Sequence, residues 1–135
     1  MKKILISGLV AGVVLLFLSI LGLLTTIGLF PNLALLYFDP AFDAQSDRAM
    51  IFYIHPFLIS FALSWFWSRF KGILTGSFFT RGIEFGLIYM LVATLPMMWF
   101  IYSVIHVSLF MIATWFVLAL VQGIIAGLIF EKINP

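Results

Sequence analysis

Four long apolar segments, each free of Lys and Arg, account for most of this chain. They cover about residues 4–30, 50–68, 83–102 and 108–130. The hydrocarbon core of a bilayer is about 30 Å thick, so a helix needs about 20 apolar residues to cross it. The sequence therefore predicts an all-α, polytopic membrane protein with four transmembrane helices.

The composition supports the same fold class. Of the 135 residues, 64% are hydrophobic and 9% are charged, whereas soluble domains have about 45–50% and about 25%. A small soluble domain leaves much of its surface exposed to water and has no place for this apolar excess. We therefore expect one four-helix transmembrane domain over residues 1–135.

The first apolar segment also has the basic start of a signal peptide, because Lys2 and Lys3 precede it. The apolar run 4–30 is much longer than the ~7–15 residues of a signal sequence, and no A-x-A-like cleavage site follows it. We expect a permanent membrane helix.

The basic residues are distributed unevenly between the two predicted membrane sides. One side holds Lys2, Lys3, Arg69, Lys71, Arg81 and Lys132, and the other holds Arg48 with Asp39, Asp43 and Asp47. Short loops rich in Lys and Arg stay in the cytoplasm. This predicts an up-down bundle with both termini cytoplasmic, in the cell membrane (the inner membrane of a bacterium).

A short pattern recurs along the chain and suggests two tandem helical hairpins. Pro-x5-Tyr occurs at Pro31 and again at Pro96, and a His precedes a Trp at similar distances in both halves, as His55 with Trp65 and His106 with Trp115. Transporter repeats show such weak internal similarity. Coincidence is the alternative, since 18% of the residues are aromatic.

Each predicted span carries small residues at helical spacing. These are Gly8 and Gly12, Ser60 and Ser64, Gly82 and Gly86, and Ala119, Gly123 and Gly127. Helices in lipid associate where small side chains let their backbones approach. The pattern predicts a compact bundle, with contacts either within one chain or between chains.

A candidate polar cluster lies on the predicted outer face. It consists of His55, His106, Asp39, Asp43 and Asp47. Imidazole nitrogens and carboxylates are ligands of divalent metals such as zinc or manganese, and two histidines can also hold haem. The alternative is a solvated acidic loop, with His55 beside Pro56 in the first turn of a helix.

Glu84 is the one acid inside a predicted span. An intramembrane carboxylate suggests a proton or cation site of a small transporter. Alternatively, Glu84 lies in the first turn of its helix, where the helix dipole favours an acid, and pairs with Arg81.

Other classes of function have less support in the sequence. The absence of Cys excludes thiol chemistry, no nucleophile stands with a recognisable base, and no basic face suits nucleic acid. The leading hypothesis is a non-enzymatic subunit or helper that acts through helix contacts, as a homo-oligomer or in a membrane complex. A homo-oligomeric transporter or channel, and an outer-face metal- or haem-binding protein, are the alternatives.

Overall fold

A computed structural model describes residues 1–36 and 49–135, and the regular structure in those ranges is helical. The elements are α1 (Lys2–Leu29), α2 (Pro31–Leu36), α3 (Ala49–Phe70), α4 (Phe78–Tyr89), a π-helical turn η1 (Met90–Thr94), α5 (Leu95–Val104) and α6 (Leu109–Ile133). Within the described residues, four helical stretches are long and apolar enough to cross a membrane: Lys2–Leu29, Met50–Phe70, Phe78–Val104 and Leu109–Ile133. This confirms the prediction of an all-α chain with four candidate spans.

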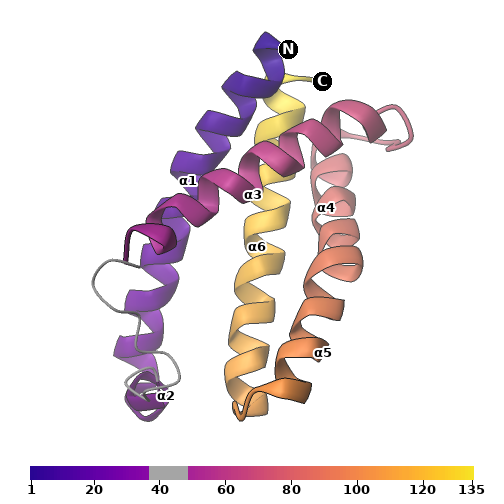
Figure 1. The fold of residues 1–135 in the computed structure, drawn as a ribbon. Coiled ribbons are helices and arrows are strands. Elements are labelled where there is room, and N and C mark those ends of the chain that lie inside the picture. The colour runs from indigo at the N-terminus through magenta and orange to yellow at the C-terminus, as the bar shows by residue number, and fades with distance from the viewer. Residues whose placement is uncertain (37–48) are drawn as a thin grey trace.

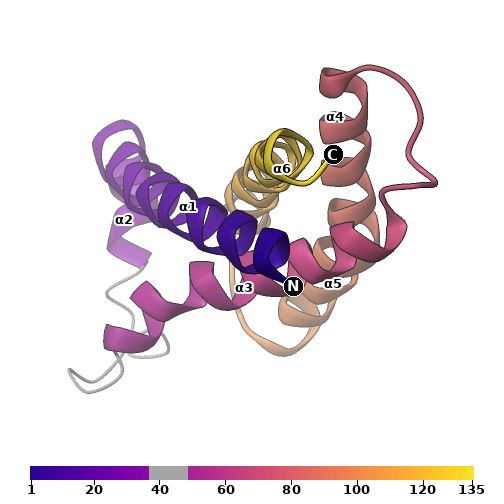
Figure 2. The ribbon, with the colours of Figure 1, turned by 90° about the horizontal axis from the view of Figure 1, so that it is seen from above.

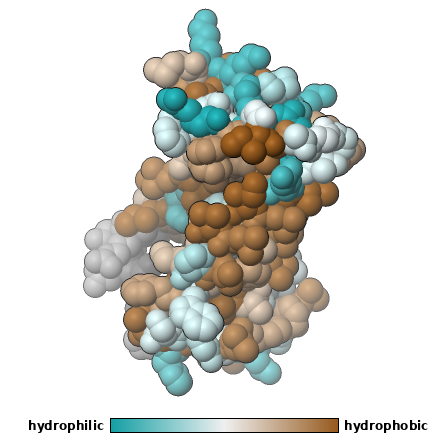
Figure 3. Space-filling view, turned by 90° about the vertical axis from the view of Figure 1, so that its right-hand side faces the viewer, coloured by the Kyte–Doolittle hydropathy of each residue, from teal (hydrophilic) through white to brown (hydrophobic). Residues whose placement is uncertain are grey.

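Both chain termini lie at one end of the molecule, which we call the terminal end (Figure 1). The α3–α4 connection lies at the same end, whereas α2 and the α5–α6 connection lie at the opposite, distal end. Figure 3 shows hydrophilic residues gathered at the terminal end above a broad hydrophobic band. The six basic residues expected on one side flank this end, at the start of α1, the end of α3, the α3–α4 connection, the start of α4 and the end of α6.

Helix α1 packs against both α3 and α6, and α4 packs against α6. Helix α3 is inclined across the others, as the two ribbon views show (Figures 1 and 2). The main cluster of buried apolar residues comprises Ala11, Leu15, Trp67, Leu74, Phe85, Ala126 and Phe130. These residues come from α1, α3, α4, α6 and the α3–α4 connection, so the core joins all four candidate spans.

The third candidate span is interrupted at its middle. Helix α4 passes into the wider turn η1, and α5 then begins with Leu95 and Pro96. Proline has no N–H to donate and its ring crowds the preceding turn, which distorts an α-helical ladder. We attribute the π-helical turn to Pro96.

Two helix boundaries differ from the sequence-based expectation. Helix α4 begins at Phe78 because the hydroxyl of Ser77 accepts a hydrogen bond from the N–H of Thr80 at 3.4 Å. Glu84 therefore lies beyond the first turn, and its expected place there is wrong. Pro56 lies in the interior of α3 and not in its first turn, because α3 extends back to Ala49.

Candidate functional site

The predicted outer-face cluster is only partly described. Asp39, Asp43 and Asp47 lie outside the described residues. His55 is exposed on α3 and His106 is exposed in the α5–α6 connection. Both ribbon views show the start of α3 well apart from that connection (Figures 1 and 2). Among the described residues, no group of three His, Cys, Asp or Glu side chains is placed to hold a metal ion.

Glu84 is exposed on α4 and does not pair with Arg81. The guanidinium of Arg81 instead binds Glu131, near the end of α6. The expected Arg81–Glu84 pair is therefore wrong. The guanidinium of Arg81 reaches Glu131 on α6, whereas the side chain of Glu84 is exposed.

The predicted small residues mostly lie at helix contacts within the chain. Gly8 and Gly12 face Phe61 and Phe57 of α3, and Gly82 and Gly86 face Leu128 and Ile124 of α6. Ser60 and Ser64 are buried, as are Gly123 and Gly127, while Ala119 is half-buried. The hydroxyls of Ser7 and Ser64 lie 2.7 Å apart, and Ser64 also donates to the carbonyl of Ile4 at 2.9 Å.

The two hairpins α1–α3 and α4–α6 share a packing pattern. In each, two glycines four positions apart receive two large side chains, also four positions apart, from the second helix. When the two halves are aligned on this pattern, Gly8 is equivalent to Gly82. The same alignment places Pro31 opposite Ile105. The repeated Pro-x5-Tyr instead equates Pro31 with Pro96. The packing therefore relates the two halves in a different register from the sequence repeat.

A polar cluster at the terminal end was not anticipated from the sequence. We call it the terminal-end cluster, and it comprises Trp67, Lys71, Arg81, Glu131 and Asn134. Arg81 Nη1 lies 2.5 Å from Glu131 Oε1, and Arg81 Nη2 donates to the carbonyl of Lys71 at 3.0 Å. The Arg81 guanidinium also lies 5.5 Å from the centre of the Trp67 ring. Trp67 Nε1 donates to the Asn134 carbonyl at 2.9 Å, and Lys71 Nζ donates to Asn134 Oδ1 at 3.0 Å.

Burial makes these polar contacts important for the fold. The side chains of Arg81 and Glu131 are 18% and 10% exposed, and Trp67 is completely buried. A charge that is largely withdrawn from water needs a partner of opposite sign. The terminal-end cluster therefore clamps α3, α4 and α6 together. The signal for it in the sequence was an acid, Glu131, next to the expected end of the fourth span and on the same predicted side as Arg81.

Arg69 differs from Arg81 in its neighbours. Its guanidinium lies 5.5 Å from the centre of the Trp65 ring, and within the described residues it pairs with no carboxylate. Arg69 and Trp65 are both exposed, although they adjoin the buried cluster in sequence.

Trp65 lines an apolar groove between α3 and the α4–η1 segment. The lining residues are Ala62, Leu63, Trp65, Phe66, Phe85, Ile88, Tyr89, Val92 and Ala93, and the cavity volume is about 360 Å³. Its only side-chain polar atoms belong to Trp65 and Tyr89. Such a groove suits an apolar ligand rather than a polar substrate.

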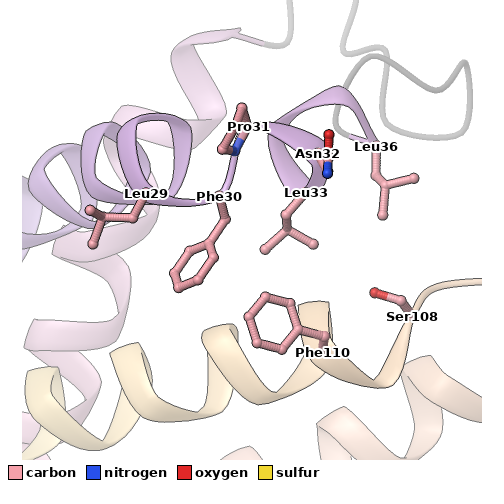
Figure 4. A pocket seen from close by; sticks show the side chains of 8 residues that line it. All are labelled: Leu29, Phe30, Pro31, Asn32, Leu33, Leu36, Ser108 and Phe110. Carbon is pink, nitrogen blue, oxygen red and sulfur yellow. The ribbon is translucent and has the colours of Figure 1, made fainter.

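A second cavity of about 340 Å³ lies at the distal end (Figure 4). Phe30 and Phe110 point toward one another across it, with ring centroids 5.2 Å apart in an edge-to-face arrangement. Ser108 also lines it and caps α6 by accepting a hydrogen bond from Met111 N at 3.1 Å. The described residues of this cavity offer no charged side chain to a ligand.

Comparison of the chain with known protein families, curated proteins and solved structures finds no match in any of the three. The candidate functions are therefore those that the chain's own contacts, burial and charge support.

Proposed function

We propose that the protein is a non-enzymatic subunit or helper that crosses the cell membrane four times, with both termini in the cytoplasm. It acts through the outward surface of its third span. The partner is another membrane-embedded helix, and a second copy of this chain is the simplest partner.

The proposed orientation follows from the charges of the terminal end. Six of the seven Lys and Arg residues flank that end, and Lys and Arg are retained on the cytoplasmic side of a membrane. An even number of spans then leaves both termini on that side.

The proposed interaction surface follows from the burial of the third span. Only 6% of the most apolar part of this span is buried inside the described molecule, against 28%, 22% and 22% for the other three spans. Helix α5 buries no residue against the described part of the chain. Trp99 is 77% exposed and Phe100 is 59% exposed on its surface.

The position of α5 also depends on few internal contacts. The π-helical turn η1 separates it from α4, and its remaining contacts are with α6. Lipid gives little drive for helix association, so a helix is fixed by close packing against another helix. A partner helix that packs on α5 supplies the close packing that the described part of this chain does not give that helix.

Photo-crosslinking in the native membrane tests this proposal. A photoreactive phenylalanine analogue replaces Phe100 in one variant and Phe17 of α1 in a control, because both side chains are exposed and apolar. We expect a crosslinked protein adduct from position 100, at twice the chain mass for a second copy, and lipid adducts alone from position 17. Lipid adducts alone from both positions would contradict the proposal.

A further inference from the structure

The apolar groove has a shape set by the inclination of α3. Helices α3 and α4 are joined by a short connection at the terminal end and diverge away from it (Figures 1 and 2). They make few direct contacts with each other, while each packs on another helix. The groove occupies the resulting wedge, and its walls come from both helices.

The residues of the groove keep it open and apolar. Ala62 on α3 and Ala93 in η1 are small, and the aromatic rings of Phe66 and Phe85 lie toward the terminal end. From Phe85 to Ala93, the wall extends about 12 Å at about 1.5 Å per residue. The lining lies within two candidate spans, so in a bilayer the groove faces hydrocarbon.

A cation lies beside the terminal end of the groove. Trp65 lines the groove, and the guanidinium of Arg69 lies over the Trp65 ring. Glu131 neutralises Arg81, whereas Arg69 has no carboxylate partner among the described residues. A guanidinium is well suited to bind a phosphate oxygen pair.

We propose that this groove binds one acyl chain of an anionic phospholipid, whose net negative headgroup is held by Arg69. The proposal rests on the membrane embedding proposed above. The lipid comes from the leaflet at the terminal end, because the cation and the aromatic end of the groove lie there. A basic site above an apolar groove between membrane helices has the chemistry that recognises anionic lipid headgroups.

Native mass spectrometry of the detergent-solubilised protein tests the proposal, with phosphatidylglycerol and phosphatidylcholine of identical acyl chains as probes. We expect the wild-type protein to retain phosphatidylglycerol preferentially. Arg69→Gln lowers that preference about fivefold, the effect of one basic contact at a membrane surface. Lys132→Gln is the matched control, because it removes an exposed cation at the same end but away from the groove lining.

A second pair of variants tests the groove itself. Ala93→Phe and Ala62→Phe each place a ring in the groove from opposite walls. We expect both to lose bound lipid while they retain the helical circular dichroism and melting temperature of the wild type. Equal retention of the two lipids by the wild type, or equal losses from Arg69→Gln and Lys132→Gln, would overturn the proposal. If photo-crosslinking from position 100 still yields the protein adduct in that case, the lipid site fails alone and the proposed function stands.

Discussion

Arg81 at the start of α4 and Glu131 near the end of α6 form an ion pair of 2.5 Å at the terminal end of the helices. Arg81 also lies over the ring of the buried Trp67, which connects the pair to α3. The contact joins the start of α4 to the end of α6 at the open end of the second hairpin. Farther along the same hairpin, glycines rather than charged residues make the contact between α4 and α6.

Removal of one charge of this pair is expected to destabilise the protein. Glu131→Gln leaves the guanidinium of Arg81 largely buried without a counterion, at a cost of about 3–5 kcal/mol. The measurement is thermal unfolding in detergent, followed by circular dichroism. The double variant Arg81→Met with Glu131→Leu removes both charges and should recover most of the loss. A Glu131→Gln protein as stable as the wild type would contradict the clamp role.

Close approach of α4 and α6 is tested by Gly86→Ala. A Cβ at Gly86 would lie 2.6 Å from the backbone N of Ile124 and 2.8 Å from its Cα, so the helices must separate. Overpacking of this kind costs about 1–3 kcal/mol. Gly28→Ala is the control, because a Cβ there meets no atom within 4 Å among the described residues. We expect a lower unfolding temperature for Gly86→Ala and an unchanged or slightly higher one for Gly28→Ala, and equal temperatures would contradict the packing.

The serine contact between α1 and α3 should contribute only modestly. Ser64→Ala removes the hydrogen bonds to Ser7 and to the carbonyl of Ile4. Ser7 retains its bond to the carbonyl of Lys3 at 2.7 Å, so no donor is left without a partner. Interhelical hydrogen bonds in membranes are worth about 0.6 kcal/mol on average. A loss several times larger in the same unfolding assay would show that this contact organises the first hairpin.

Glu84→Gln tests whether the intramembrane acid has a function. Because Glu84 is exposed and unpaired with Arg81, we expect its substitution to change stability by less than about 0.5 kcal/mol. Reconstituted vesicles give the second readout, proton or cation flux. A flux that depends on Glu84 would favour the transporter hypothesis over the subunit hypothesis.

The sequence predicted the helical class and the number of candidate spans because both depend on length and hydrophobicity alone. The turn at Gly76 was also predictable, since its positive φ of 108° is a conformation that glycine adopts readily. The partner of Arg81 was not predictable. Glu84 lies three residues from Arg81 on the same helix at any rotation of α4, whereas Glu131 comes within reach only when the Arg81 side of α4 faces α6. Length and overall hydrophobicity do not determine that rotation. The groove was also hidden, because it depends on the inclination of α3.

The account depends most on four membrane crossings with the terminal end in the cytoplasm, and labelling of single cysteines tests this directly. The native chain has no Cys, so Gly72→Cys, Lys3→Cys and His106→Cys each provide one site, and Gly72 has open space for a side chain. A membrane-impermeant maleimide applied to intact cells should label His106→Cys at once. It should label Gly72→Cys and Lys3→Cys only after the membrane is permeabilised. Labelling of Gly72→Cys and His106→Cys from the same side would contradict the account.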